Sequence, residues 1–566
     1  MADERTPQQR LLARRADLWN ERSSWDAHCQ DIADYLLPRA ARFDESSRNR
    51  NGQSDFNSII DETGTLAHGV MSAGLMAGLT SPARPWFRLA TPDPDLMEYA
   101  PVKRWLNKTT LKMLSIFNAS NTYRAFHSMY DQIGAFGIGA SVVVDNYDNV
   151  LHHYPQTFGR YAIGLNQWGA ADSLYRDMVK TVAQLVEEFG EENCSQAVRN
   201  LYSRGKYDAE VKVVHAIEPR RDREYGRKDN RNMPWKSCYI EVGRDSDRYL
   251  RESGFSEFPA IAARWAVDGE DTYASRWPGA VALGSIKQLQ QEQIQKSTAI
   301  DYQVEPPLQV PVAYRNQEID RLPGGLMFVD TAGPGGAVKT AFDVRLDINH
   351  LLADIQDVRH RINSSFYVDL FKMISNDDRS NITAREIAER HEEKLLLLGP
   401  MTERFHNEAL KPKIDITFAK MMRAGMFAPG AVLEPPEEMK GVDLEVDFVS
   451  TLAQAQRAVG VQAIDRLVGT IASVSQIKPE VLDKLDGDQL IDTYADMLGV
   501  DPSLIVADDD VALIRKDRRA QQQMAEMAAA AAPMKDMAMA AKTASETDTN
   551  ALTSAFSGYG VPGVFQ

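Results

Sequence analysis

Apolar and polar residues follow a helical spacing through most of residues 276–427, and this part of the chain is the most informative. The run 346–372 carries apolar side chains three and four positions apart, which predicts an amphipathic helix packed on a core. These side chains are Ile348, Leu351, Leu352, Ile355, Val358, Ile362, Phe366 and Leu370. From Asp347 to Phe371 a continuous helix would extend about 37 Å, at about 1.5 Å per residue.

The run 276–302 is also helical but has a thinner apolar stripe, made by Ile286, Leu289 and Ile300. It contains five glutamines, at positions 288, 290, 291, 293 and 295. Because so little apolar surface cannot be buried against one neighbour alone, we expect lateral packing, including packing against copies of the same helix.

An insert rich in proline and glycine, residues 303–345, separates these two helices. It opens with VEPPL and contains the strand-like runs QVPVAY and GLMFVD, which is the chemistry of turns and edge strands that pair between chains. A polar loop, 373–381, then leads to a third long helix, 382–427. Thr383 and Glu386 form a capping box at its start, and Gly399-Pro400 predicts a kink.

Residues 1–275 indicate a mixed α+β body. Helices are expected over 8–37, 59–79 and 103–137, and the glycines of the second predict close helix packing. The first helix places four apolar side chains near one face, namely Leu12, Ala16, Trp19 and Trp25. Short strands are predicted for ASVVVDN, VLHHYP, FGRYAIG, EVKVVHAIEP and WKSCYIEV, with one helix over DMVKTVAQLVEEFG.

The C-terminal third is less distinctive. Helical runs continue through 428–505, and an Ala/Met/Gln-rich helix with a break near Pro533 follows over 506–545. We expect the polar stretch 546–566 to be a disordered tail. The predicted fold class is therefore α+β and mainly helical.

Composition and charge narrow the function. The 566 residues carry 64 basic and 80 acidic side chains, a formal charge of −16, which repels nucleic acid on average. That argues against a sequence-reading DNA binder, but it suits a protein that lets DNA slide past. The three cysteines form no CxxC pair, so we expect a reducing cytoplasm and no zinc. No apolar run is long enough for a membrane span, and no membrane partner is expected.

Motifs for catalysis are not found. The Gly205-Lys206 pair lacks the rest of a P-loop, and HEEKL at His391 lacks the second histidine of a zinc protease. The adjacent His152 and His153 would point to opposite faces of a strand, which disfavours a shared metal. We therefore expect no enzyme activity, no cofactor and no metal.

The loop 373–381 has two interpretations. It is either a plain turn between two helices or a mobile finger that touches something moving along them. In the second case Arg379 would meet a phosphate, while Asp377 and Asp378 would keep the contact weak.

As an ordered set, several segments make the chain similar to the portal proteins, the head-to-tail connectors of short-tailed, T7-like bacteriophages. They are DETGTLAHGVMSAGLMAGLTSPARPWFRL, YDQIGAFGIGASVVV, the helices around VEPPL, and TAREIAERHEEKLLLLGPMTERFHNEALKP. The resemblance covers most of the chain up to about residue 430.

The resemblance implies a portal fold assembled as a dodecameric ring at the capsid vertex. Its parts would be a wing (1–275), stem helices (276–302 and 346–372), a clip (303–345), a tunnel loop (373–381), a wing helix (382–427), a crown (428–505) and a barrel helix (506–545). Double-stranded DNA would pass through the ring during packaging and ejection. Implied partners are terminase, tail or adaptor proteins, and the major capsid and scaffolding proteins. Assembly is expected in the host cytoplasm, with the protein then part of the virion.

Candidate residues follow from these parts. The tunnel loop would present Asn376, Asp377, Asp378 and Arg379 to DNA. Phosphate contacts in the stem would come from Lys287, Lys296 and Arg359. Docking of terminase or tail proteins on the clip would involve Glu305, Pro306, Pro307, Gly324 and Gly325.

Two alternatives remain open at this point. A packaging enzyme would need a P-loop or a carboxylate metal site. A helical tail or scaffold protein without a DNA channel would share the helices but not the Pro/Gly-rich insert between two of them.

Overall fold

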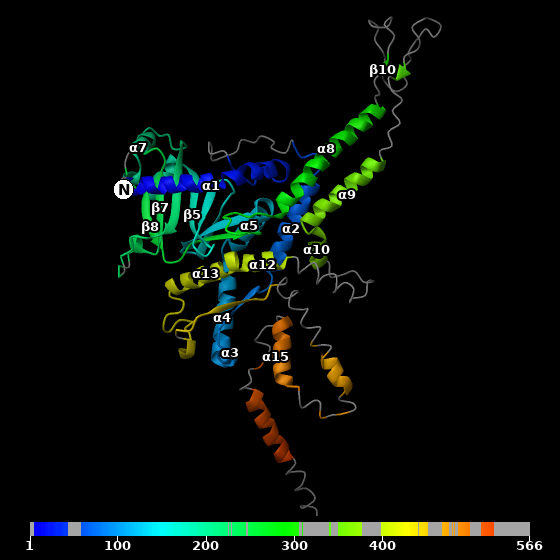
Figure 1. Cartoon of the computed structure of the whole chain (residues 1–566). Helices are drawn as coiled ribbons and strands as arrows, with labels where there is room; N and C mark the ends of the chain where they lie inside the picture. Colours follow the sequence, from blue (N-terminus) through cyan, green and yellow to red (C-terminus); the bar gives the residue numbers. More distant parts are fainter. Residues whose placement is uncertain are drawn as a thin grey trace, which may run out of the picture.

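The computed structural model describes residues 5–43, 58–304, 308–309, 339–340, 349–375 and 398–450, and pieces of 464–525. Within these ranges, residues 225, 228, 245, 246 and 440 are not described. A mixed body of helices and sheets carries a projecting pair of helices, and further helices lie beyond the opposite end of the body (Figure 1). The α+β class predicted for the first 275 residues is confirmed.

One part of the body is built on a five-stranded antiparallel sheet in the order β4-β5-β6-β7-β8. Its strands are β4 (Tyr161–Leu165), β5 (Ala171–Thr181), β6 (Glu210–Pro219), β7 (Trp235–Glu241) and β8 (Arg251–Phe255). Helix α1 (Pro7–Tyr35) lies across one face of this sheet (Figure 1). Helices α6 (Val182–Phe189) and α7 (Gln196–Ser203) pack on an apolar cluster that includes Val213 of β6 and Tyr239 of β7.

The sequence prediction was wrong over residues 177–181. Asp177 to Thr181 continue strand β5, where they pair with Val214 to Glu210 of β6, and the helix begins only at Val182. Thr181 caps that helix, with Gln184 completing a capping box. Thr181 is both the last residue of the strand and the cap of the helix. Because no loop separates the two elements, the apolar pattern does not show where one ends and the other begins.

Helix α1 packs on the core through the predicted Leu12, Trp19 and Trp25, which are partly buried, but its most buried side chains are others. It buries Leu11, Leu18, Cys29 and Ile32, whereas Ala16 is exposed. Polar side chains share the buried face: Arg22 is 2% exposed and donates to the backbone carbonyl groups of Tyr161 and Gly159. A buried arginine interrupts the apolar stripe, so the apolar pattern alone did not show the centre of the buried face.

A second sheet and four helices connect the five-stranded sheet to the rest of the body. The sheet has the order β3-β2-β9, with bounds β2 (Ile138–Asn146), β3 (Val150–Pro155) and β9 (Ala260–Arg264). The helices are α2 (Thr63–Leu79), α3 (Pro94–Glu98), α4 (Ala100–Ala119) and α5 (Thr122–Phe136). The largest apolar core runs between these elements and the base of the projecting helices.

The projecting pair consists of α8 (Pro278–Val304) and α9 (Asn349–Ser365), which lie side by side (Figure 1). One continuous helix was predicted to follow the insert, and this was wrong. The helix ends at Ser365, and α10 (Val368–Ser375) follows in a new direction. Tyr367 has a left-handed backbone with φ of 56°, which is costly for a residue with a side chain.

The break after α9 is held by packing on both sides. Phe366 is buried with its ring edge-on to His68, and the ring of Tyr367 stacks on Trp265. The strain at Tyr367 thus lets both Phe366 and the apolar face of α10 reach the core.

Packed against the body, α12 (Gly399–Phe405), a π-helical turn (His406–Leu410) and α13 (Lys411–Arg423) run on without a gap. Gly399-Pro400 begins the described helix, and the π-helical turn was not predicted. Strand β12 (Glu445–Phe448) then pairs with β1 (Phe87–Ala90). The described part of the C-terminal third includes α15 (Gly487–Leu498) and a helix over 511–525. No helix among the described residues has the length and apolar character that crossing a bilayer requires.

Candidate functional site

The α8–α9 pair is buried only at its base. On α8 the buried side chains end at Glu292, and on α9 they are Ile355, Val358 and Ile362. Further along α8 the apolar side chains are exposed: Ile294 by 45%, Ile300 by 39% and Val304 by 74%. A single copy of the chain therefore supports the lower half of the pair and leaves the upper half without a covering layer.

Glutamine side chains join α8 to the segment that precedes α2. The Gln290 side-chain oxygen accepts from the backbone N–H groups of Ile60 (2.7 Å) and Asp61 (2.8 Å). Its amide nitrogen donates to the carbonyl oxygen of Asp61 at 3.0 Å. Because Gln290 is only 4% exposed, this glutamine acts as a buried backbone clamp. Part of the glutamine-rich composition of α8 is explained by this contact within one chain.

Asp61 ties together α2, α8 and α9. Its carboxylate accepts from the N–H group of Thr63 (2.9 Å), the Gln293 amide (2.8 Å) and the Arg359 guanidinium (2.7 Å). Burial would raise the pKa of Asp61, but the hydrogen bonds from Thr63 and Arg359 outweigh it and hold the pKa below its ordinary value. Asp61 is thus a charged anchor at the base of the helix pair.

A second carboxyl group at this base, that of Glu292, has its pKa shifted in the opposite direction from that of Asp61. Glu292 of α8 is 6% exposed and its Oε2 atom has no hydrogen-bond partner among the described residues. Burial and the nearby Asp354 of α9 raise its pKa, although a hydrogen bond from Gln288 opposes the shift. Two carboxyl groups therefore face each other between the paired helices.

The three basic residues predicted to contact phosphates do not form one patch. Lys287 reaches back to Asp31 of α1 at 2.9 Å and lies 5.1 Å from the centre of the Tyr35 ring. Arg359 pairs with Asp61, and Lys296 is half-buried further along α8. Since nine residues are two and a half helical turns, Lys287 and Lys296 lie on opposite sides of α8.

The other predicted contact residues lie outside the described part of the chain. These are Asn376, Asp377, Asp378 and Arg379 of the predicted tunnel loop, and Glu305, Pro306, Pro307, Gly324 and Gly325 of the predicted clip. The structure does describe where both segments begin. Strands β10 (Leu308–Gln309) and β11 (Lys339–Thr340) pair antiparallel within the insert. Helix α10 ends at Ser375, so residues 373–375 of the predicted tunnel loop belong to this helix and the loop prediction was wrong there.

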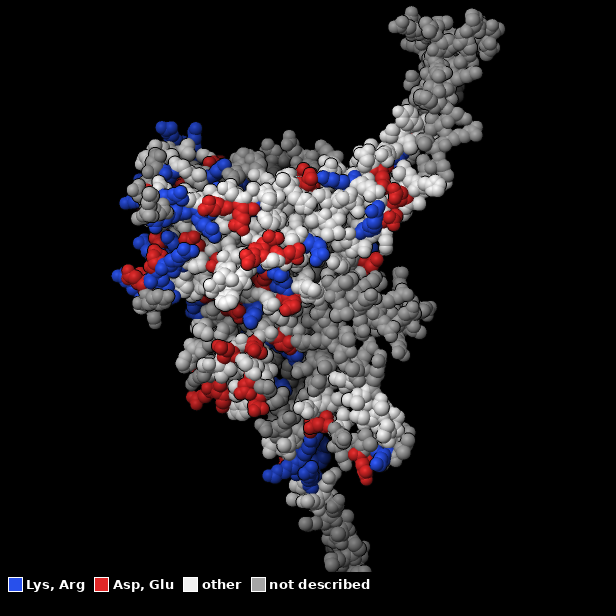
Figure 2. Space-filling model, viewed as in Figure 1, with Lys and Arg blue, Asp and Glu red and all other residues white. Residues whose placement is uncertain are grey.

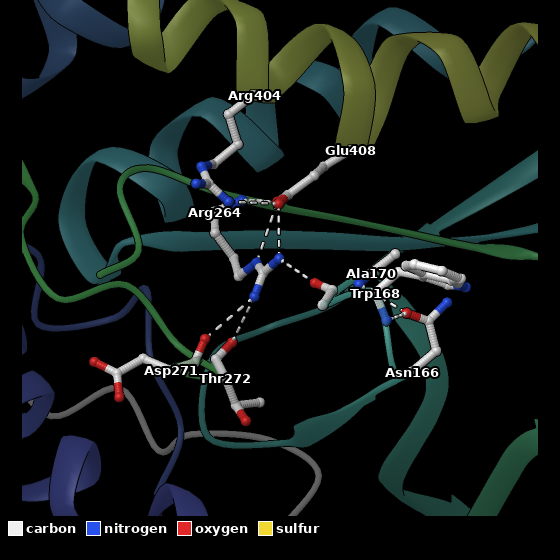
Figure 3. Close-up of polar contacts among 9 residues, drawn as sticks. Asn166, Trp168, Ala170, Arg264, Asp271, Thr272, Arg404 and Glu408 are labelled. Atoms are coloured by element: carbon white, nitrogen blue, oxygen red, sulfur yellow. Dashed lines mark hydrogen bonds and ion pairs between the residues drawn. The ribbon is translucent and has the colours of Figure 1, made fainter. Parts of the chain in front are cut away.

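The sequence interpretation missed a polar centre around Arg264 (Figure 3). The guanidinium group of this residue, at the end of β9, is 4% exposed and pairs with Glu408 at 2.7 Å. It also donates to the carbonyl oxygen of Gly169 at 2.7 Å, and Arg404 pairs with the same Glu408 at 3.0 Å. No local motif marks these residues, because they come from three distant segments.

Charge is unevenly distributed over the body. Figure 2 shows Lys and Arg gathered at the end of the body near α7 and β8, whereas both signs are interspersed along the α8–α9 pair. Among the described residues, no group of three or more His, Cys, Asp or Glu side chains is arranged to hold a metal ion.

Comparison with known proteins agrees with this architecture. The family model of the bacteriophage head to tail connecting protein matches residues 8–506. A protein named as a probable portal protein, from Bordetella phage BPP-1, is 53% identical over 98% of this chain and 100% of its own length. The portal protein of Salmonella phage epsilon15 is 42% identical over 98% of this chain and 99% of its own.

Among solved structures, one chain from the neck of an empty gene transfer agent particle matches with a TM-score of 0.32 and 12% identity. The match covers 76% of this chain and 90% of that one. The family assignment is based on the sequence matches, which extend over nearly the whole length of both relatives. This chain belongs to the bacteriophage head-to-tail connecting proteins, the portal proteins of phages.

Proposed function

We propose that twelve copies of this chain close into a ring at the head–tail junction, and that double-stranded DNA passes through its channel during packaging and ejection. The paired helices α8 and α9 form the stem of this ring. The observation that carries the proposal is the exposed apolar upper half of α8, where Ile294, Ile300 and Val304 lack a covering layer in one copy. Neighbouring copies of the same helix would supply that layer.

Electrostatics fit a conduit better than a DNA-gripping protein. The chain is acidic overall, at −16, and two of the three basic residues predicted to contact phosphates form ion pairs: Lys287 with Asp31, and Arg359 with Asp61. Cations held by carboxylates attract phosphates weakly, which allows a duplex to move along the stem.

Two further segments are assigned roles on the same basis. The clip, 303–345, is the docking surface for terminase during packaging and for tail proteins afterwards, and it begins at the end of α8 that points away from the body (Figure 1). The tunnel loop, 373–381, contacts the passing DNA and starts in the last turn of α10, a helix that is packed on the core. The remaining partners are the major capsid and scaffolding proteins, which would meet the outside of the ring.

Electron microscopy of the purified protein, with its mass measured by light scattering, tests the ring. Closed rings with a hole wide enough for duplex DNA support the proposal. A monomer or dimer that persists at high concentration and varied salt would contradict it. Rings without such a hole would favour the second candidate, a helical tail or scaffold component without a DNA channel.

Deleting residues 376–379 tests the tunnel loop. The rings should still form, because the loop contributes nothing to the apolar stripes of the stem, while DNA packaging or retention should fall. Failure of ring formation would instead make the loop an assembly element. For the clip, replacing residues 303–345 by a short glycine linker should abolish binding of terminase or tail proteins, and unchanged binding would remove the clip from that role.

A further inference from the structure

One tryptophan differs from all the others in its exposure. The chain has eight tryptophans, all of them described, and Trp168 is the one whose side chain is exposed, at 82%. Trp86, Trp105, Trp265 and Trp277 are each at most 7% exposed. A large aromatic side chain in water is costly unless a partner covers it, and tryptophan is enriched among the residues that dominate protein interfaces.

The loop that presents Trp168 is rigid. It joins β4 to β5, and the Asn166 side-chain oxygen accepts from the backbone N–H groups of Trp168 (2.9 Å) and Ala170 (3.0 Å). Two backbone hydrogen bonds close the turn: the N–H group of Asn166 donates to the carbonyl oxygen of Ala170, and the N–H group of Gly169 donates to the carbonyl oxygen of Asn166. Gly169 adopts a left-handed φ of 72°, which glycine reaches without strain.

Arg264 attaches this turn to the body. Its guanidinium donates to the Gly169 carbonyl oxygen at 2.7 Å and is itself held by Glu408, as the close-up shows (Figure 3). Trp168 is therefore displayed at a fixed position next to a buried ion pair. A preorganised side chain loses little conformational entropy when a partner covers it, so each contact contributes more to affinity.

The position of the turn indicates which partner covers it. Arg264 also donates to the carbonyl oxygens of Asp271 and Thr272, in the segment that leads into α8. The turn thus lies near the root of the stem, and β4, the strand that precedes it, is at the opposite edge of the sheet from β8. In a closed ring the copies converge toward the channel, so surfaces near the stem root face the next copy rather than an outer shell.

We propose that Trp168 is an anchor of the contact between neighbouring copies of this chain. The inference rests on the proposed ring and adds to it a residue that sets the strength of subunit association. The partner is a second copy, whose surface covers the indole ring when the ring closes.

Two measurements test this anchor. Mass photometry over a concentration series should show that Trp168→Ala weakens assembly by about 30-fold or more in the dissociation constant of neighbouring copies, as expected for an interface hot spot. Trp168→Phe should weaken the association of neighbouring copies less than Trp168→Ala does, because it keeps an aromatic ring. Acrylamide quenching of the wild type, with Trp168→Phe subtracted, should show an indole that is accessible in monomers and shielded in rings.

Tyr147 provides the matched control. It is fully exposed in the turn between β2 and β3, and Tyr147→Ala should assemble as the wild type does. Circular dichroism melts of all variants should coincide before assembly, because an exposed side chain contributes little to folding.

The outcomes separate the two proposals. Rings of Trp168→Ala that form at wild-type concentrations, with Trp168 still quenched in wild-type rings, would overturn the anchor alone. An indole that is shielded only after capsid or tail proteins are added would also overturn it, because the partner would be a different protein. A wild type that never forms rings would overturn the ring itself.

Discussion

The ring of Phe371 occupies the space that a side chain at position 74 would need. A Cβ atom built on Gly74 would come within 2.3 Å of the Phe371 ring, and Phe371 is buried at 3% exposure. This contact fixes α10 against α2, directly before the predicted tunnel loop. It also explains a glycine in the middle of α2, where the residue lowers helix stability. Gly64 serves α8 similarly, since its Cβ would lie 3.1 Å from Ile286.

Substituting Gly74 by alanine should therefore destabilise the protein by about 1–3 kcal/mol, as overpacking of a core does. Gly69 lies on the same helix with no atom within 4 Å of a built Cβ, so Gly69→Ala should be neutral or stabilising by up to about 1 kcal/mol. Chemical denaturation of both variants checks the difference. If Gly74→Ala costs less in a Phe371→Ala background than in the wild type, the contact with the Phe371 ring is the cause. Equal stability of the two alanine variants would contradict the packing argument.

The sequence predicted the elements whose apolar spacing is strong. The strands β2, β3, β4, β6 and β7 and the helices α1, α2 and α8 lie close to where they were expected. It failed where tertiary contacts outweigh local pattern. The stripe through Ile362, Phe366 and Leu370 is equally regular on both sides of Tyr367, so the break could not be read from spacing. The break is stabilised by packing of Phe366, Tyr367 and Phe371 against His68, Trp265 and Gly74, and these three partners are distant in the sequence.

The candidate site was predictable in outline only. The helices and the insert between them could be recognised, but the partners of their polar residues could not. Asp61, 298 residues away from Arg359, carries no signal in the sequence that it pairs with the stem. Likewise, Arg264 and Trp168 are ordinary residues until Gly169 and Glu408 are brought beside them by folding.

Removing the guanidinium of Arg359 should loosen the base of the stem. In Arg359→Gln, Asp61 keeps its bonds from Thr63 and Gln293 but loses a charged donor, so we expect a loss of about 1–2 kcal/mol, reduced by the partial exposure of Arg359. Hydrogen exchange should become faster over residues 58–66. The folded pKa of Asp61 is depressed, so its stabilising effect exists above its unfolded pKa and is lost as pH falls through the folded value.

Arg361→Gln is the matched control for this prediction. Arg361 lies two residues further along α9, and its pair with Asp357 is exposed, at 47% and 66%. Its loss should cost less than about 0.5 kcal/mol. Equal effects of the two substitutions on exchange over 58–66 would show that the Asp61 contact does not anchor the stem.

Neutralising Glu292 should have the opposite effect. Burial and Asp354 raise its pKa, so the folded state holds a proton more readily than the unfolded state, and stability falls as pH rises through that range. Glu292→Gln should therefore increase the free energy of unfolding at pH 8 by about 1 kcal/mol, which is measured as a higher melting temperature. At pH 4.5 the substitution should change stability little. Asp301→Asn, at an exposed carboxylate of α8, is the control. A gain at pH 4.5 as large as at pH 8 would exclude the charge as its cause.

A buried pair of bases lies between β3 and α13. The Nζ atom of Lys413 is 2.7 Å from Nε2 of His153, and both side chains are at most 1% exposed. Ser141 lies 3.2 Å from the other ring nitrogen, and the Phe117 ring is 4.8 Å from the lysine. Burial lowers the pKa of both groups well below their ordinary values, with Lys420 adding to the shift of Lys413 and Lys413 to that of His153.

The pair should therefore make the protein less stable as the pH falls. The unfolded chain binds protons on Lys413 below its ordinary pKa of 10.5 and on His153 below 6.5, while the folded chain does so only at lower pH. Replacing both residues by apolar ones, Lys413→Met with His153→Phe, removes this penalty. The buried Ser141 hydroxyl loses its bond to His153, a cost that does not vary with pH because the hydroxyl does not titrate in this range. Relative to the wild type, the double variant should gain stability from pH 9 to pH 5, by at most about 1.4 kcal/mol per pH unit for each titrating group. Chemical denaturation at pH 5, 7 and 9 measures the difference, and a constant difference across that range would mean that the pair is equally protonated in the folded and unfolded states.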